Sequence, residues 1–165
     1  MNNTETVQQQ ETALEIKTIL VAVDLSPHSE RTVAYAVSIA RQFGASLEVI
    51  HVYAPPTATE FGGQDMYGLL EKDREDTERR LTSLVDRVRA TYRKCESLLK
   101  TGDLSEQVAR AALLSRADLI VVGRHHQTFL GRLLKLDQAP RIAHQAVCPV
   151  LVCEDEDNRA KEASI

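Results

Sequence analysis

The chain has 165 residues, of which 43% are hydrophobic and 27% are charged, and its formal net charge is -4. This length fits one domain around one hydrophobic core, and this composition excludes a fibrous repeat or a wholly disordered chain. Because the basic residues form no block and are interleaved with acids, we expect no nucleic-acid partner.

Both ends of the chain are expected to be flexible tails around a domain at 16–154. Residues 1–15 are rich in Asn, Thr, Gln and Glu, a composition that cannot offset the entropy of ordering, and the second tail covers 155–165. The amino terminus lacks the basic and apolar pattern of a signal peptide, and no apolar run reaches the ~18–20 residues that span a bilayer. We expect a cytoplasmic location and no membrane partner.

The first strand and helix are marked by a change in hydrophobic period. The apolar run Ile16–Val23 predicts a strand buried on both faces of a parallel sheet, and Asp24 ends it. Ser26 is the predicted N-cap of the next helix, with Pro27 at its first position, and Gly44 is the predicted stop. Apolar residues at helical spacing lie between them: Val33, Ala36, Val37, Ala40 and Phe43.

The middle of the chain predicts a strand, a loop and a long helix. Leu47–Tyr53 is the second strand, which the prolines at 55 and 56 end. Residues 54–67, with Pro, Thr and Gly-Gly, predict an exposed and mobile loop. Residues 70–92 predict an amphipathic helix with a solvated outer face. Its apolar stripe consists of Leu81, Leu84, Val85 and Val88.

The last part of the chain predicts three strands and two helices. Strands are expected at 95–100, at 118–123 and at 150–153, the second of these being the clearest. A helix should begin at Ser105 and a shorter one should span 140–145. The residues of the first helix expected to face inward are Val108, Ala111, Ala112 and Leu114.

Five alternations of strand and helix predict an α/β fold, a doubly wound parallel sheet with right-handed crossovers. Ligands of such sheets bind beyond the carboxyl ends of the strands, where Asp24, Val52, Tyr53 and Gly123 fall. Asp24 could hold a ligand's amine or hydroxyl, or accept backbone N–H groups at the helix start. Gly123 suits a close backbone approach but is also ordinary turn chemistry.

Residues that would support catalysis or metal binding are sparse. His125 and His126 are adjacent, so a metal site would need further ligands such as His28 or Asp24, and we expect none. No G-x-S-x-G elbow is present, which argues against a hydrolase. Three cysteines with no metal-ligand spacing are interpreted as buried thiols, with a redox or metal role as the alternative: Cys95, Cys148 and Cys153.

Three segments together resemble the universal stress protein family along nearly the whole chain. They are KTILVAVDLSPHSERTVAYAVSIARQFGASLEVIHVY, TGDLSEQVARAALLSRADLIVVGRH and VCPVLV. The resemblance implies a five-stranded parallel sheet in the order 3-2-1-4-5, of adenine-nucleotide alpha hydrolase or Rossmann-like type. It also implies homodimers formed through the final strand, whose residues are Val150, Leu151, Val152 and Cys153.

ATP-binding members of this family have a phosphate loop after the fourth strand, in which glycine N–H groups surround the phosphates and a hydroxyl adds a donor. Gly123 matches the first glycine of that pattern. His126, Leu136 and Asp137 stand at its other three anchors, and Asp137 would repel a phosphate. Asp137 is better explained as the N-cap of the last helix.

The stretch from His125 to Gln127, followed by Phe129, is similar to the founding branch of the family, whose members do not bind ATP. A nucleoside-sized pocket could survive, because Asp24 and Val52 match positions that contact adenosine. The candidate residues of this degenerate nucleotide pocket are Asp24, Val52, Gly123, Arg124 and His126.

The leading hypothesis is a non-enzymatic stress-response factor that acts as a homodimer through contacts with other proteins and has no cofactor. The alternative is a regulatory module that binds ATP or AMP through an altered loop, with Arg124 and His126 as phosphate donors. A weak nucleotide hydrolase ranks third, because no residue has an evident role as base or nucleophile.

Overall fold

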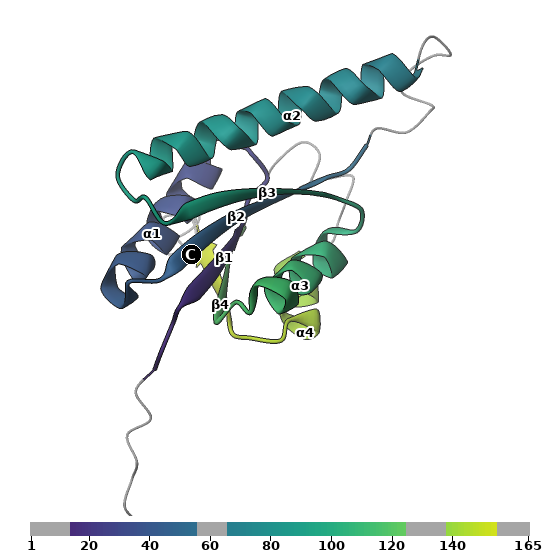
Figure 1. Ribbon diagram of the computed structural model, residues 1–165. Helices are drawn as coiled ribbons and strands as arrows, with labels where there is room; N and C mark the ends of the chain where they lie inside the picture. The colour runs from purple at the N-terminus through teal and green to yellow at the C-terminus, as the bar shows by residue number, and fades with distance from the viewer. Residues whose placement is uncertain (1–13, 56–65, 125–137, 155–165) are drawn as a thin grey trace, which may run out of the picture.

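The computed structural model describes residues 14–55, 66–124 and 138–154. The predicted tails, most of the loop at 54–67 and the N-cap role of Asp137 lie outside these residues and stay predictions. Figure 1 shows the order of the elements along the chain. They are β1 (Thr18–Ala22), α1 (Ser29–Phe43), β2 (Ser46–Tyr53), α2 (Met66–Arg89), β3 (Cys95–Thr101), α3 (Leu104–Ser115), β4 (Leu119–Arg124), α4 (Gln138–Gln145) and β5 (Val150–Glu154).

The five strands form one parallel sheet in the order β3-β2-β1-β4-β5, which confirms the predicted fold. Helices α1 and α2 cover one face of this sheet, and α3 and α4 cover the other (Figure 1). All five strands point the same way, so their carboxyl ends share one edge. The two outermost strands of the sheet are β3 and β5.

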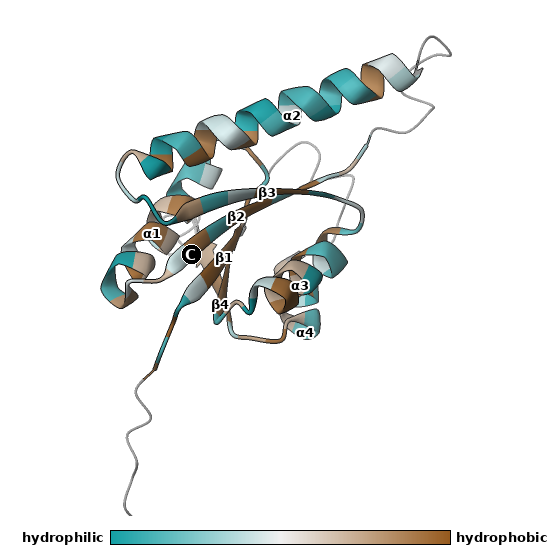
Figure 2. Cartoon of the chain, viewed as in Figure 1, coloured by the Kyte–Doolittle hydropathy of each residue, from teal (hydrophilic) through white to brown (hydrophobic). Residues whose placement is uncertain are grey.

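Alternate residues of the central strands enter two separate hydrophobic clusters. Ile19 and Val21 of β1 pack beneath α1 and α2, whereas Leu20 between them packs beneath α3 and α4. All three are fully buried. Because both faces are covered, the central strands β1 and β4 are mainly apolar, as Figure 2 shows for β4, while the visible surface of α2 is mainly hydrophilic.

The prediction that Ser26 is the N-cap of the first helix is wrong. Helix α1 begins at Ser29, after His28, whose side chain makes no capping bond. Residues 24–28 form a turn that Asp24 organises, so the first helical residue lies two positions later than predicted. The predicted stop is confirmed, because Gly44 adopts the left-handed conformation with φ of 68°.

The start and the inner face of the third helix also differ from the prediction. Asp103 is the N-cap of α3, and its Oδ1 accepts hydrogen bonds from the N–H of Glu106 and the hydroxyl of Ser105. Leu114, expected to face inward, is 71% exposed. It lies roughly 60° beyond Ala111 around the helix, outside the arc that faces the sheet.

Helix α2 is displaced toward the amino terminus of its predicted range. It starts at Met66 and ends at Arg89, so the last two residues of the predicted loop are helical. Its apolar stripe is confirmed, because Leu81, Leu84 and Val85 are buried against the sheet.

Candidate functional site

The sheet order brings most of the predicted site residues to one edge. Asp24 follows β1, Val52 lies near the end of β2, and Gly123 and Arg124 end β4. Because β1 lies between β2 and β4, these positions occupy three neighbouring strands at their carboxyl ends. Val52 packs partly into the cluster beneath α3 and α4. His126 lies outside the described residues.

Asp24 organises the turn that joins β1 to α1. Its Oδ1 accepts hydrogen bonds from the backbone N–H of Ser26, over 2.9 Å, and from the hydroxyl of Ser29, over 2.8 Å. The carboxylate thereby satisfies donors at the start of α1. Of the two roles considered for Asp24, these contacts favour the structural one for this oxygen.

The residue after Asp24 adopts a backbone conformation that side chains rarely tolerate. Leu25 has φ of 59°, in the left-handed region, where a bulky residue is an outlier. Arg80 of α2 donates from Nη2 to the Leu25 carbonyl oxygen over 2.8 Å. The Leu25 side chain also packs against the cluster beneath α1 and α2. Contacts from two directions therefore hold this turn.

A histidine that the sequence analysis did not select lies beneath this turn. His51 of β2 and the Val23 carbonyl oxygen are 2.8 Å apart, and because a carbonyl only accepts, Nδ1 of His51 is the donor. Burial lowers the pKa of His51 below its ordinary value of 6.5, although Val23 and Asp24 favour its charged form. His51 is therefore neutral at pH 7. The signal that could have identified His51 in the sequence is its position as a polar residue inside a mainly apolar strand.

Tyr53 connects the end of β2 to α2. Its hydroxyl donates to Oδ2 of Asp73 over 2.7 Å, and the side chain is 7% exposed. Burial, with the hydrogen bond to Asp73, raises the pKa of Tyr53 to about 12. The phenol therefore stays protonated and acts as a donor that fixes α2 to the sheet.

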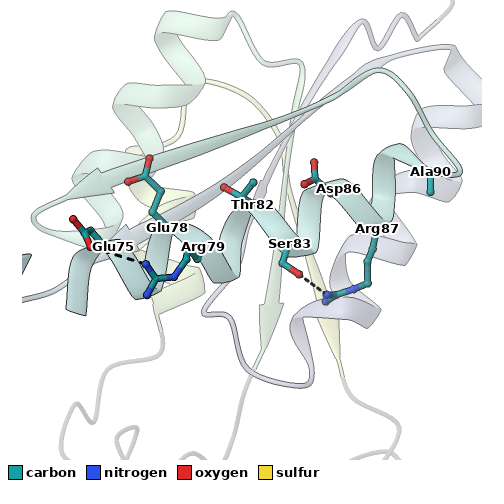
Figure 3. Close-up of a pocket in the computed structure, with 8 residues that line it drawn as sticks. All are labelled: Glu75, Glu78, Arg79, Thr82, Ser83, Asp86, Arg87 and Ala90. Atoms are coloured by element: carbon teal, nitrogen blue, oxygen red, sulfur yellow. Dashed lines mark hydrogen bonds and ion pairs between the residues drawn. The ribbon is translucent and has the colours of Figure 1, made fainter. Parts of the chain in front are cut away.

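Two concave regions involve α2. The first, of about 850 Å³, is lined by residues 75–90 of one helix and its end, so it cannot enclose a ligand (Figure 3). The second, of about 950 Å³, lies between the turn after β1 and α2. Its rim carries both signs of charge and an ion pair of 2.8 Å between Glu30 and Arg87.

The three cysteines are free thiols. Cys95 is fully buried, which confirms the prediction for it, whereas Cys148 and Cys153 are half-buried. Burial raises the pKa of all three, to about 11 for Cys95, so none is an activated thiolate. Within the described ranges, no three His, Cys, Asp or Glu side chains group closely enough for a metal ion.

Among the helices that the structure describes, none combines the length and the apolar character needed to cross a membrane.

A doubly wound parallel sheet with polar residues at its carboxyl edge defines the class of this domain, and comparisons with known proteins identify the family. The model of the universal stress protein family matches residues 15–154. Universal stress protein A of Escherichia coli is 34% identical over 125 residues, which covers 72% of this chain and 81% of that protein. The chain belongs to the universal stress protein family, as its sequence segments predicted.

Two further relatives extend this similarity. The universal stress protein in the QAH/OAS sulfhydrylase 3′ region of Thermus aquaticus is 32% identical over 136 residues, which covers 82% of this chain and 97% of that protein. A crystal structure of a universal stress protein in complex with cAMP is similar with a TM-score of 0.63 and 25% identity. That match covers 85% of this chain and 98% of the other.

Proposed function

We propose that the chain is a non-enzymatic stress-response factor that acts in the cytoplasm as a homodimer and through contacts with other proteins. The observation that carries this proposal is the edge strand β5, where Leu151 and Val152 are each 37% exposed. An edge strand presents unpaired N–H and C=O groups, and an apolar one is an aggregation hazard. Pairing with a second copy about a two-fold axis satisfies these groups.

The opposite edge of the sheet provides a contrast that favours β5 as the interface. Strand β3 carries Glu96 and Lys100, and charged side chains discourage pairing with another chain. Arg89 of α2 covers the start of this edge, donating to the Cys95 carbonyl oxygen over 2.7 Å and to Glu96 over 2.6 Å. Residues 150–153 of β5 are all apolar or thiol.

The non-enzymatic part of the proposal is supported by how the polar groups at the carboxyl edge are used. Asp24 binds the start of α1, His51 binds the Val23 carbonyl and Tyr53 binds Asp73. Each makes a hydrogen bond that holds one element to the next. Three anchors of the phosphate loop are replaced in this sequence, which argues against tight nucleotide binding.

Light scattering coupled to size-exclusion chromatography tests the homodimer. Leu151→Lys should convert dimer to monomer, because the charge would be buried unpaired in the interface. Ser97→Lys is the matched control, since Ser97 is an exposed residue of the other edge strand. A monomeric parent protein, or a dimer that Ser97→Lys disrupts and Leu151→Lys does not, would contradict the proposal.

The second candidate function is a nucleotide-binding regulatory module. It is favoured by the relative that is described in complex with cAMP. The residues that would contribute are Asp24, Val52, Gly123, Arg124 and His126. Freshly purified protein should be denatured and its supernatant examined for adenine nucleotides by absorbance and mass, and a stoichiometric nucleotide would favour this function over the first.

A further inference from the structure

The hydrogen-bonding groups of β5 alternate between β4 and the free edge. The N–H of Ile120 donates to the carbonyl oxygen of Pro149 over 2.9 Å, and Ile120 lies opposite Val150 in the ladder. A residue in a parallel ladder bonds to both neighbours of the residue opposite it, so Ile120 bonds to Pro149 and Leu151. Leu151 therefore directs its N–H and C=O toward β4, whereas Val150 and Val152 direct theirs outward.

This alternation restricts how two copies of β5 can pair. In an antiparallel pair, two opposite residues exchange hydrogen bonds only where the groups of both point at the partner strand. A two-fold axis between residues 151 and 152 would set an inward-pointing residue against an outward-pointing one along the whole strand. The axis must instead pass through one residue and its own copy.

We infer that the two-fold axis of the dimer passes through Val152, so that Val152 pairs with the partner's Val152. The inference rests on the proposed homodimer and defines its interface. Val152 is the midpoint of β5 (Val150–Glu154) and one of its outward-pointing residues. An axis there aligns all five residues of both copies and sets Val150 opposite the partner's Glu154.

The neighbouring positions for the axis, at Leu151 and Cys153, use the strand less well. An axis through Leu151 would require Cys148 and Pro149 to extend the ladder, but the chain bends at Cys148, which packs into the core beside α3 and α4. An axis through Cys153 would align only three residues of β5. Neither uses the full length of the regular strand.

The assigned axis predicts one specific contact between subunits. Leu151 lies opposite the partner's Cys153 in a pair that exchanges no hydrogen bonds, where the two Cα atoms are about 4.5 Å apart. Leu151 and Cys153 lie opposite Val121 and Gly123 in the ladder, so both point to the face that α1 covers. A Cα separation of this size lies within the range that a disulfide spans.

Disulfide cross-linking of the full chain tests the position of the axis. The parent protein, Leu151→Cys, and Leu151→Cys combined with Cys153→Ser are incubated with oxidised glutathione and run on non-reducing gels. Peptide mass mapping identifies the linked cysteines. Most of Leu151→Cys should migrate at twice the mass of one chain, linked through position 153 of the partner, whereas the parent protein and the double variant should stay at the single mass.

Three results would overturn the inference, provided that the parent protein sediments as a dimer. Cross-linking of the double variant would place the axis at Leu151. Cross-linking of the parent protein between two copies of Cys153 would place it at Cys153. A dimeric Leu151→Cys protein without cross-links would place the interface elsewhere. A parent protein that sediments as a monomer would contradict the proposed homodimer itself.

Discussion

Arg80 of α2 holds the carbonyl oxygen of Leu25, the one left-handed residue of the turn between β1 and α1, at 2.8 Å. The two residues lie 55 positions apart in the sequence. The left-handed backbone of a leucine is strained, and such strain persists only where surrounding contacts determine the conformation. The relationship links the longest helix of the fold to the turn that starts at Asp24.

Arg80→Ala should lower the free energy of unfolding by about 1 kcal/mol, because it removes a charge-assisted hydrogen bond from a strained turn at a partly hydrated site. Urea unfolding measures the change. Arg79→Ala is the control, because the Arg79 guanidinium pairs with Glu75 and Asp76 on the surface of the same helix, and such pairs contribute little. Equal effects of the two substitutions would mean that the hydrogen bond from Arg80 to Leu25 contributes no specific stability.

Tyr53→Phe should destabilise the fold by about 1–2 kcal/mol, because the ring still packs but Asp73 loses its hydrogen-bond donor. The same substitution at Tyr35, which is 49% exposed, should leave the midpoint of thermal unfolding unchanged. An unchanged midpoint for Tyr53→Phe would mean that the bond to Asp73 contributes no net stability.

The free energy of unfolding should fall as the pH is lowered from 7.5 to 5.5. The pKa of His51 is lowered in the folded chain by burial, so the unfolded chain binds a proton more readily. The stability that neutral His51 contributes is present above the unfolded pKa of about 6.5 and is lost as the pH falls through the folded pKa.

His51→Gln should remove part of this pH dependence, while His144→Gln, at an exposed position of α4, should leave it intact. Urea unfolding at several pH values gives the comparison. If both variants keep the full pH dependence of the parent protein, His51 is not its source.

Asp103→Ala should lower the midpoint of thermal unfolding at pH 7, because α3 loses its N-cap. Asp103→Asn should retain most of the stability that the cap contributes, because asparagine also caps helices. Hydrogen bonds from Ser105 and from the Glu106 N–H hold the pKa of Asp103 below its ordinary value of 3.8. The contribution of the charged form is therefore present above that value and is lost as the pH falls through the folded pKa. The difference in thermal midpoint between Asp103→Ala and the parent protein should therefore become smaller as the pH is lowered.

ATP should bind weakly, because three anchors of the phosphate loop are missing and each charge-assisted hydrogen bond is worth ~1.5–3 kcal/mol. Restoring the pattern with His126→Gly, Leu136→Gly and Asp137→Ser should raise the affinity measured by calorimetry. A low-micromolar constant for the parent protein would reject the expectation. No gain in the triple variant would indicate that no adenosine pocket remains.

The fold could be predicted because its signals are repeated along the chain. The clearest strands are apolar runs and each of the first three strands is followed by a helical stripe, so small errors at the ends of elements did not alter the topology. The order of strands came from family resemblance, since periodicity does not specify which strands are neighbours. Leu114 was misplaced because an apolar residue near the edge of a helical stripe can still face water.

The site was predictable only in part, because its organising contacts join distant residues. Strand ends placed Asp24, Val52 and Gly123 at one edge. The contacts of Tyr53 with Asp73 and of Arg80 with Leu25 depend on how α2 lies over the sheet, which no local pattern encodes. The N-cap prediction at Ser26 failed for a related reason: the chain first forms a turn in which Asp24 accepts the Ser26 N–H, and α1 begins only at Ser29.

Amide hydrogen exchange along β5, followed by NMR, tests the proposed homodimer most directly. The N–H of Leu151 points to β4 and should be protected in a monomer or a dimer, whereas the N–H of Val152 points to the free edge. Pairing of two β5 strands predicts that Val152 exchanges as slowly as Leu151. A Val152 amide that exchanges at the rate of an exposed amide, beside a protected Leu151, would contradict the dimer.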